Sequence, residues 1–466
     1  MFEEIEFQGR WWLPDEEDNQ ITGCLKITPY SEAILELQGS FDDDFSGAAE
    51  FSPSILLGIA NNGRLITLND CILTNRTDSS YGYPTLRLFV HRVFVGIHLN
   101  KAEEITFDRI TVRYLHFHEW FNGHNFKVER KYKPYKIFIQ YEQLQPLKFN
   151  YNDCAVEIGT GWSLQESSST VTLTEDAWIR FDSQRDRPLN DFFTLVHHFQ
   201  NFLSLAMSMP TFPTQVIGQT GKSKRVAEGK ELYTPIDIYY PAIGWTSEPK
   251  KTHSFEMLFT LPNVKDLLEV YFANWMSKAE QFKPVHDLYF GSLYKPDQYV
   301  ESTFLSLAQA IETYHRRRVG GKYQSDEEYR ENLYKKFVEA IPTEIDAGFK
   351  RSLIDGKLKY ANEYSLRKRL GELAARISAN LPIPFLSAKA LEKAFVEKVC
   401  DTRNYLTHYD PELKEKAAQG EELYDLTIKL KAIIEICLLE DLGFNFMTIK
   451  EIFTNNRKYR HIMRWN

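Results

Sequence analysis

One stretch organises the second half of the chain: Leu391-Glu-Lys-Ala-Phe-Val-Glu-Lys-Val-Cys-Asp-Thr-Arg-Asn-Tyr-Leu-Thr-His-Tyr-Asp-Pro411. Its apolar side recurs at steps of three and four residues, the spacing of one face of an α-helix. The members of that face are Leu391, Phe395, Val399, Thr402 and Leu406. Because Pro411 cannot continue a helix, the stretch predicts a core-packed helix that ends just before it.

Three polar residues lie in the last turns of this predicted helix. At about 100° per residue, Asn404 and His408 fall in line with Cys400, opposite the apolar face. Arg403 falls at the edge of that line. The three residues therefore form a reactive group at a helix end that faces away from the helix's own core. A solvated helix end whose histidine is favoured by the helix dipole explains the same pattern.

The composition is that of a globular protein with two or three domains. The chain has 466 residues, of which 43% are hydrophobic and 26% charged. Its formal net charge of -8 excludes a surface that is positive throughout, although a local basic groove can still hold nucleic acid. No repeat, low-complexity tract or glycine-rich phosphate loop appears in the sequence.

The cysteines and the start of the chain indicate a cytoplasmic location. Five cysteines stand at positions 24, 71, 154, 400 and 437, without a Cys-x-x-Cys pair. Such scattering favours reduced thiols over disulfides or a zinc site. The acidic start lacks an apolar signal core, and the most apolar helical stretch, residues 192–209, contains several polar residues. We therefore expect no secretion and no membrane segment.

Residues 1–185 predict a β-rich domain, a twisted antiparallel sheet or barrel. Short runs of β-branched and aromatic residues are separated by turn residues, including Asn61-Asn62-Gly63. The expected strands include residues 24–28, 33–39, 64–68, 86–97, 105–115 and 136–141.

Two groups of residues in this domain suggest ligand binding, and each also has a simpler structural interpretation. Trp11 and Trp12 can form a stacking platform, but large aromatic residues on a first strand more often bury in a core, which we favour. The histidines His116, His118 and His124 can be read as zinc ligands, but no cysteine lies near them. We expect neither a metal nor a cofactor.

The remaining chain changes from a mixed pattern to a helical one. Residues 186–282 predict a mixed α/β continuation of the first region, with helices over 188–209 and 263–282. Residues 283–298 contain two prolines and predict a linker. Residues 299–466 predict an all-α bundle. Its first helix carries the apolar stripe Phe304, Leu307, Ile311 and Tyr314 and ends in the basic run before Gly320-Gly321, and the capping box Ser325–Glu328 starts a second helix. Further helices are expected at 344–361, 365–379, 387–409, 421–441 and near 447.

The helical block resembles the HEPN superfamily. Its ribonucleases carry an arginine and a histidine separated by four to six residues, often with an asparagine directly after the arginine, as in Arg403-Asn404-x-x-x-His408. The helix Phe304-Leu-Ser-Leu-Ala-Gln-Ala-Ile-Glu-Thr-Tyr-His-Arg316 is similar to the first helix of the HEPN domain in ApeA-like anti-phage proteins. The opening Gly9-Arg-Trp-Trp-Leu-Pro14 looks like the N-terminal domain of that same family.

The resemblance implies an abortive-infection endoribonuclease that cuts RNA without a metal ion. His408 would move protons, Arg403 would stabilise phosphate charge and Asn404 would orient the histidine or hold the substrate. One histidine is little for both acid and base work, and HEPN ribonucleases commonly dimerise to bring two motifs into one cleft. We therefore expect a homodimer through the helical domain. Transfer RNA is a reasonable target, and a phage component is the expected trigger.

The first predicted helix carries further candidates. Glu312 occupies a position where HEPN enzymes often place an acidic residue, so it can pair with Arg403; a helix pair with Arg316 is an equal alternative. The run His315, Arg316, Arg317 and Arg318 can bind RNA phosphates, though basic residues at a helix end need no function. A non-catalytic HEPN scaffold remains the competing interpretation of the whole chain, ahead of nucleotidyl transfer, for which no signature is visible.

Overall fold

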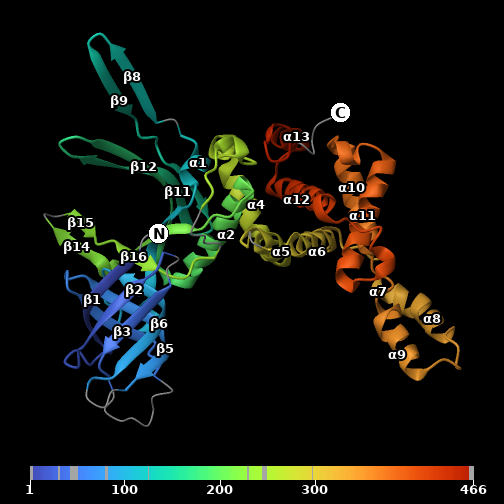
Figure 1. The fold of residues 1–466 in the computed structure, drawn as a ribbon, viewed down its shortest axis with the longest axis horizontal. Helices are drawn as coiled ribbons and strands as arrows, with labels where there is room; N and C mark the ends of the chain where they lie inside the picture. The colour runs from blue at the N-terminus through green and yellow to red at the C-terminus, as the bar shows by residue number, and fades with distance from the viewer. Residues whose placement is uncertain are drawn as a thin grey trace. The chain divides into compact units, whose positions relative to one another are not determined.

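The computed structural model describes residues 4–29, 32–41, 51–78, 82–123, 125–227, 230–243, 249–295 and 298–460. The chain forms two compact units, Met1–Ala273 and Asn274–Asn466 (Figure 1). The first is built on a β-sheet and the second is helical, so the predicted order of a β-rich region followed by an all-α bundle is confirmed.

The first unit is organised by a 12-stranded sheet in the order β10-β11-β12-β7-β13-β16-β6-β3-β2-β1-β4-β5. An additional pairing of β5 with β6 closes the strands from β6 to β5 into a barrel. The sheet strands are β1 (Ile5–Trp12), β2 (Ile21–Ile27), β3 (Ala33–Gln38), β4 (Ile55–Ala60), β5 (Leu65–Thr77), β6 (Thr85–Val95), β7 (Thr106–Tyr114), β10 (Leu147–Tyr151), β11 (Cys154–Glu166), β12 (Val171–Pro188), β13 (Pro213–Gln219) and β16 (Ile236–Tyr239).

Both tryptophans are buried, as we expected, but on opposite sides of β1, because successive side chains of a strand point to opposite faces. Trp11 is 0% exposed and belongs to the barrel core, whereas Trp12 is 5% exposed and its ring packs edge-on against His98 with the ring centroids 5.4 Å apart. A Cβ atom at Gly58 would lie 2.2 Å from the Trp11 ring, so the neighbouring strand needs a glycine where the indole crosses it.

Two shorter two-stranded sheets and several helices complete this unit. The small sheets are β8 (Phe126–Tyr132) with β9 (Tyr135–Tyr141), and β14 (Lys224–Ala227) with β15 (Lys230–Tyr233). The helices are α1 (Phe117–Phe121), α2 (Leu189–Met207), α3 (Leu261–Val264) and the start of α4 (Leu268–Lys278). Helix α2 is largely buried, and among the described residues no helix is long and apolar enough to cross a membrane.

Two predicted domain boundaries are corrected by the structure. The division at residue 185 falls inside β12, and the same sheet continues into β13 and β16, so residues 186–239 belong to one folded body with the preceding strands. The predicted linker 283–298 begins with helix α5 (Lys283–Leu293). Pro284 lies in the first turn of α5, where a proline displaces no helical hydrogen bond.

The second unit packs its helices around α6 (Val300–Val319) and α12 (Gly420–Leu442). Helix α6 contacts α5, α10, α11 and α12. The buried Glu435 of α12 accepts a hydrogen bond from the Tyr289 hydroxyl at 2.6 Å, so this carboxylate is paired inside the core. The other elements are α7 (Asp326–Glu328), a π-helical turn Tyr329–Tyr334, α8 (Lys335–Glu339), α9 (Ala347–Gly356), α10 (Leu366–Asn380), α11 (Lys389–His408) and α13 (Phe446–Asn455).

A small helical insertion, α7 to α9, separates α6 from α10 and extends outward from them (Figure 1). Its base is held by backbone hydrogen bonds from Tyr323 to the Asn362 carbonyl and from Tyr364 to the Gly321 carbonyl, both 3.0 Å long. The C-terminal end of α6 and the start of α10 are thereby joined side by side. That junction matters for the site described next.

Candidate functional site

Helix α11 carries the arginine, the asparagine and the histidine singled out from the sequence. Its apolar face is buried at Phe395, Val399, Thr402 and Leu406, whereas Leu391 is 45% exposed, so that face begins one turn later than predicted. The Thr402 hydroxyl accepts a hydrogen bond from the Ala418 amide at 2.9 Å. This contact fixes the last turns of α11 against the connection that leads to α12.

We predicted that Cys400 lies on the outward face of this helix, but the structure buries it. It is 5% exposed, because α6 and α10 both pack on α11. Burial raises the pKa of the Cys400 thiol to about 11, so the sulfur stays protonated and is no nucleophile at neutral pH. The line of residues Cys400, Asn404 and His408 therefore reaches solvent only at its C-terminal end, where Asn404 is half-buried and His408 is exposed.

Arg403 lines a cavity of about 570 Å³ between α6, α10 and α11, which we call the Arg403 cavity. Its Nη1 donates a hydrogen bond to the Asn404 Oδ1 at 3.1 Å. Among residues 298–460, which the structure describes throughout, it makes no ion pair. The cavity is lined by Leu305, Ala308, Gln309, Glu312, Thr313, Arg316, Arg317, Leu366, Arg403 and Thr407.

Glu312 lies in the wall of the same cavity but pairs with another arginine. Its Oε1 lies 3.2 Å from the Arg316 Nη2, one helical turn along α6. Arg316 also contacts the Glu363 Oε2 through Nη1 at 3.0 Å. Of the two sequence alternatives, the structure thus shows the helix pair, while it also places Glu312 and Arg403 in one cavity.

His408 is the last residue of α11. The helix stops there because Tyr409 adopts a left-handed conformation with φ 53°. The imidazole is exposed, and His408 is not among the residues that line the Arg403 cavity. Within one chain the structure therefore joins Arg403 with Glu312, Arg316 and Arg317, and leaves His408 outside that group.

His315 was predicted to contact RNA, but the structure shows that its side chain is buried. Its side chain is 1% exposed, its Nε2 lies 2.8 Å from the Glu372 Oε2 and its Nδ1 lies 3.3 Å from the Arg369 Nη1. Burial lowers the pKa of His315, a shift that Glu372 opposes. Its place was visible in the sequence, since it follows Ile311 by four residues and so extends the apolar face of α6.

Arg369 was missed in the sequence and anchors the same cluster. It is 1% exposed and donates to the carbonyl oxygens of Gly320 at 2.6 Å, Gly321 at 3.2 Å and Tyr364 at 2.9 Å. We name Arg369, His315 and Glu372 the buried arginine cluster. The available signal was spacing, because Arg369 lies four residues before Leu373 on the apolar face of α10.

The other two arginines of α6 differ from each other. Arg317 lines the Arg403 cavity, and its Nη1 lies 3.4 Å from the Gln281 carbonyl oxygen. The Arg318 Nε instead lies 3.3 Å from the Oδ1 of Asp441, a carboxylate whose side chain is 7% exposed. The fold thus uses Arg318 to neutralise a buried carboxylate.

His116 and His118 of the first unit each lie beside a carboxylate of their own. His116 precedes α1 and its Nδ1 lies 3.4 Å from the Glu119 Oε1, while the His118 Nε2 lies 4.0 Å from the Glu175 Oε2. His124 lies outside the described residues. Across the described part of the chain, no group of three or more histidine, cysteine or acidic side chains is placed to hold a metal ion.

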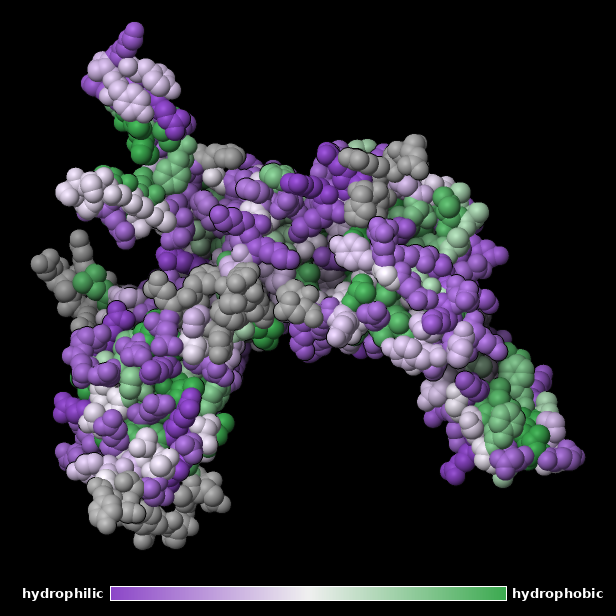
Figure 2. All heavy atoms as spheres, in the orientation of Figure 1, coloured by the Kyte–Doolittle hydropathy of each residue, from purple (hydrophilic) through white to green (hydrophobic). Residues whose placement is uncertain are grey.

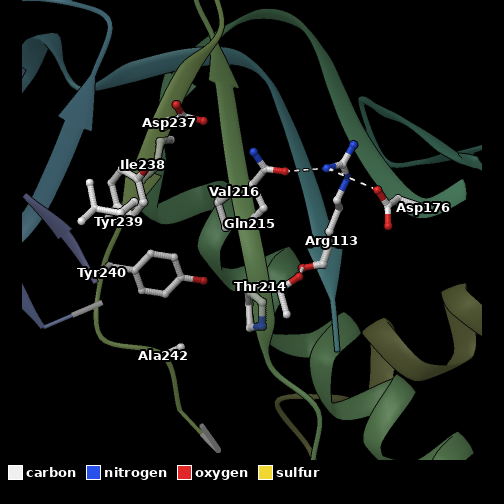
Figure 3. A pocket seen from close by; sticks show the side chains of 12 residues that line it. Arg113, Asp176, Thr214, Gln215, Val216, Asp237, Ile238, Tyr239, Tyr240 and Ala242 are labelled. Atoms are coloured by element: carbon white, nitrogen blue, oxygen red, sulfur yellow. Dashed lines mark hydrogen bonds and ion pairs between the residues drawn. The ribbon is translucent and has the colours of Figure 1, made fainter. Parts of the chain in front are cut away.

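The first unit contains a cavity of its own, about 430 Å³, over β7, β13 and β16 (Figure 3). The Arg113 Nη1 donates to the Gln215 Oε1 at 2.8 Å and lies 4.0 Å from the Asp176 Oδ2. Opposite them, burial raises the pKa of Asp237 and raises the pKa of Tyr239 to about 12. The arrangement offers both polar and aromatic contacts, but the Arg113 guanidinium is already held by the sheet.

Two family models match the chain. The model described as ApeA N-terminal domain 1 matches residues 6–275, and the model described as Apea-like HEPN matches residues 305–446. No curated protein and no solved structure matches the chain. The first match spans the sheet unit and more than half of the chain, and the second contains the Arg403 cavity and the end of α11. The chain therefore belongs to the ApeA family, with ApeA N-terminal domain 1 followed by an ApeA-like HEPN domain.

Proposed function

We propose that the protein is a metal-independent endoribonuclease of an anti-phage, abortive-infection system. The ApeA-like HEPN family suggests an anti-phage HEPN nuclease, and HEPN domains are generally associated with ribonuclease activity. RNA cleavage in the cytoplasm would stop growth of the infected cell, with transfer RNA as a candidate target and a phage component as the trigger.

The observation that carries the proposal is how the Arg403 guanidinium is bonded. It lines an open cavity, and the partner recorded for its guanidinium in the described chain is the Asn404 amide, one position along the helix. A guanidinium held by a neutral amide keeps its charge and most of its donors available for a phosphate. In this proposal Asn404 orients Arg403. It also lies one helical turn from His408.

The reaction assigned to these residues is attack by the ribose 2′-hydroxyl on its own phosphate. The 2′ oxygen loses its proton and bonds to phosphorus, the bond from phosphorus to the 5′ oxygen breaks, and that oxygen takes up a proton. Histidine suits both transfers because its ordinary pKa lies near neutrality. Arg403 stabilises the negative charge that builds on the phosphate oxygens. The products are a 2′,3′-cyclic phosphate and a 5′-hydroxyl.

A homodimer supplies what one copy lacks. His408 is exposed at the end of α11 and stands outside the cavity that Arg403 lines. In a two-fold dimer the same surface of each copy faces its partner, so two helix ends with two histidines can share one substrate. We assign one motif to each side of a composite site, with Glu312 setting the charge balance around Arg316.

Arg316 and Arg317 are the RNA-binding residues of this proposal. Both line the Arg403 cavity, and the side chain of Arg316 is 49% exposed. Arg316 is already paired with two carboxylates, so Arg317 is the more available cation for a substrate phosphate. The last member of the predicted run, Arg318, is a weaker candidate because it already pairs with Asp441.

The direct test incubates purified full-length protein with labelled RNA in the presence of EDTA. We expect cleavage that leaves 2′,3′-cyclic phosphate ends in the wild type, and its loss in Arg403→Ala and His408→Ala. Matched controls are Arg351→Ala, whose arginine is 86% exposed on α9, and His91→Ala, an exposed histidine of β6. Cleavage that persists in both motif variants, or that needs added metal, would remove the basis of the proposal.

The competing function is a non-catalytic HEPN scaffold. The pairing of Glu312 and Glu363 with Arg316 favours it to a degree, since these carboxylates lower the positive charge of the cavity. A scaffold predicts that phage protection survives in His408→Ala, whereas an enzyme predicts that protection is lost while the dimer remains.

A further inference from the structure

The hairpin formed by β8 and β9 exposes apolar side chains on both of its strands. It extends from the body of that unit as a separate two-stranded ribbon, and hydrophobic side chains are visible on its surface (Figures 1 and 2). In a sheet with a buried face, residues of this kind would point into a core. Here the exposed fractions are 51% for Val128, 51% for Ile137 and 58% for Ile139.

The strand register divides the hairpin into two different faces. Residues paired directly across antiparallel strands point to the same side. The pairs Phe126–Tyr141, Val128–Ile139, Arg130–Ile137 and Tyr132–Tyr135 therefore share one face, which we call the apolar face. The pairs Lys127–Gln140, Glu129–Phe138 and Lys131–Lys136 share the opposite, polar face.

The base of the hairpin is fixed to the main sheet, so the apolar face has a defined position. The Tyr141 hydroxyl donates to the Glu175 Oε1 at 2.8 Å, and the Asn125 amide donates to the same oxygen. The Glu142 amide donates to the Asn125 carbonyl at 3.1 Å. Beyond this base, the apolar face continues for the length of the ribbon without a covering element among the described residues.

The hairpin is also strongly basic within an acidic chain. Between residues 126 and 141 it carries five cations and one carboxylate, whereas the whole chain has a net charge of -8. The cations are Lys127, Arg130, Lys131, Lys133 and Lys136, and the carboxylate is Glu129. The Lys131 Nζ lies 3.6 Å from the Glu129 Oε1, so one lysine is partly neutralised and the excess positive charge remains. Such a ribbon repels a second copy of itself and attracts an acidic partner.

We propose that the β8–β9 hairpin is a docking arm for an acidic, extended segment of another protein. Each strand of a two-stranded ribbon has one backbone edge that is not paired with the other strand. Such an edge accepts an added strand through main-chain hydrogen bonds. Alternate apolar side chains of the added strand would pack beside Val128, Ile137 and Ile139. Its acidic side chains would meet the lysines of the polar face.

This assignment is independent of RNA cleavage, because the hairpin belongs to the sheet unit and its occupant is a polypeptide. The middle of the apolar face is aliphatic, whereas its aromatic rings lie at the two ends, where Phe126 packs against Tyr141 and Tyr132 against Tyr135. Aliphatic residues such as Val128 and Ile139 contribute little to base stacking, for which aromatic rings are needed. They do suit the apolar side of a strand. The combination of an aliphatic middle of this face, free edges and a cationic flank is what favours a peptide over a nucleic acid.

The test uses full-length protein and a soluble synthetic peptide of alternating glutamate and valine, with its alternating lysine and valine counterpart as a charge control. Binding is measured by calorimetry, and backbone protection by hydrogen exchange. We expect the glutamate peptide to bind, to slow exchange within residues 126–141, and to bind at least about tenfold more weakly to Ile139→Asn and to Val128→Asn. The matched control is Ile72→Asn, at a β5 residue that is 52% exposed, and it should bind like the wild type.

Other occupants are measured with the same variants. A single-stranded RNA, vesicles containing phosphatidylserine, and self-association by sedimentation are each compared between the wild type and Ile139→Asn. An unchanged response in all three supports the peptide. The proposal is overturned if the glutamate peptide does not bind, if the lysine peptide binds equally well, or if Ile139→Asn instead weakens RNA binding, vesicle binding or self-association.

Discussion

The helical unit contains two arginine–histidine groups that differ in what surrounds them. In the buried arginine cluster, Arg369 donates to three backbone carbonyls and to His315, and both side chains are almost fully enclosed. At the end of α11, Arg403 is held by the Asn404 amide alone in the described chain, and His408 is exposed.

This difference separates residues whose side chains are bonded within the fold from residues whose side chains remain available to a substrate. Arg369 joins the end of α6 to the start of α10, and so it holds in place the segment that carries Arg316 and Arg317. Arg403 joins nothing outside its own helix by a side-chain bond that the structure records. The first group should therefore govern stability and the second should govern chemistry.

The largest effect is expected on activity, from Arg403→Ala and His408→Ala. Each should lower the rate of RNA cleavage by about a hundredfold or more, because one stabilises charge and the other moves protons in the transition state. Each should change the free energy of unfolding by less than about 1 kcal/mol, since neither side chain is needed by the core. Urea unfolding alongside the cleavage assay checks the separation, which would break down if loss of activity always accompanied loss of stability.

The next effect is expected on stability, from Arg369→Ala. Removing this guanidinium leaves three buried carbonyl oxygens and His315 without their donor, so we expect a loss of about 3 kcal/mol or more in the free energy of unfolding. Arg351→Ala on exposed α9 is the matched control and should stay within about 0.5 kcal/mol of the wild type. A change at Arg369 as small as that of the control would show that the cluster is not a structural anchor.

The contrast also explains what the sequence could and could not reveal. The helices, several strands and the outward placement of His408 follow from local spacing and from caps such as Ser325 with Glu328, whose reciprocal bonds the structure contains. The long strands β11 and β12 are not among the predicted strands. The burial of Cys400 and the pairing of Glu363 with Arg316 do not, because they depend on helices that are distant in sequence. A wheel drawn for one helix carries no information about its neighbours.

The domain limits failed for a related reason. Proline content suggested a linker at 283–298, yet Pro284 lies in the first turn of α5, where proline is tolerated. The limit at residue 185 falls inside β12, while the mixed continuation expected after it is present, because the sheet resumes beyond α2 with β13 and β16. His315 was read by its charge when its spacing from Ile311 placed it on the buried face. Spacing was the better guide than residue type in that case.

A smaller effect distinguishes two adjacent arginines of α6. Arg317→Ala should weaken RNA binding and lower the slope of log affinity against log salt by about 1, since it removes one phosphate contact. Arg318→Ala should leave that slope unchanged, because its side chain pairs with Asp441. Titrations of a cleavage-deficient His408→Ala protein at several salt concentrations measure both. Equal slopes for the two variants would contradict the assignment.

The smallest effect concerns pH and the buried cluster. Burial lowers the pKa of His315 below its ordinary value of 6.5 in the folded protein, against the opposing effect of Glu372. The unfolded chain therefore binds the proton more readily, so the stability that neutral His315 provides is present above about pH 6.5 and is lost as the pH falls through the folded pKa. Urea midpoints from pH 8 to pH 5 should fall less steeply in His315→Gln than in the wild type. His91→Gln, at an exposed histidine, should follow the wild type.

The proposal that two chains share one site is tested most directly by mixing active and inactive chains. Wild-type and His408→Ala proteins are unfolded together in different ratios, refolded to allow exchange of chains, and assayed for RNA cleavage in EDTA. A mixed dimer keeps a single histidine, so a site that needs both histidines predicts that activity falls as the square of the wild-type fraction. A fall in direct proportion to that fraction, in samples shown to contain mixed dimers, would contradict the shared site.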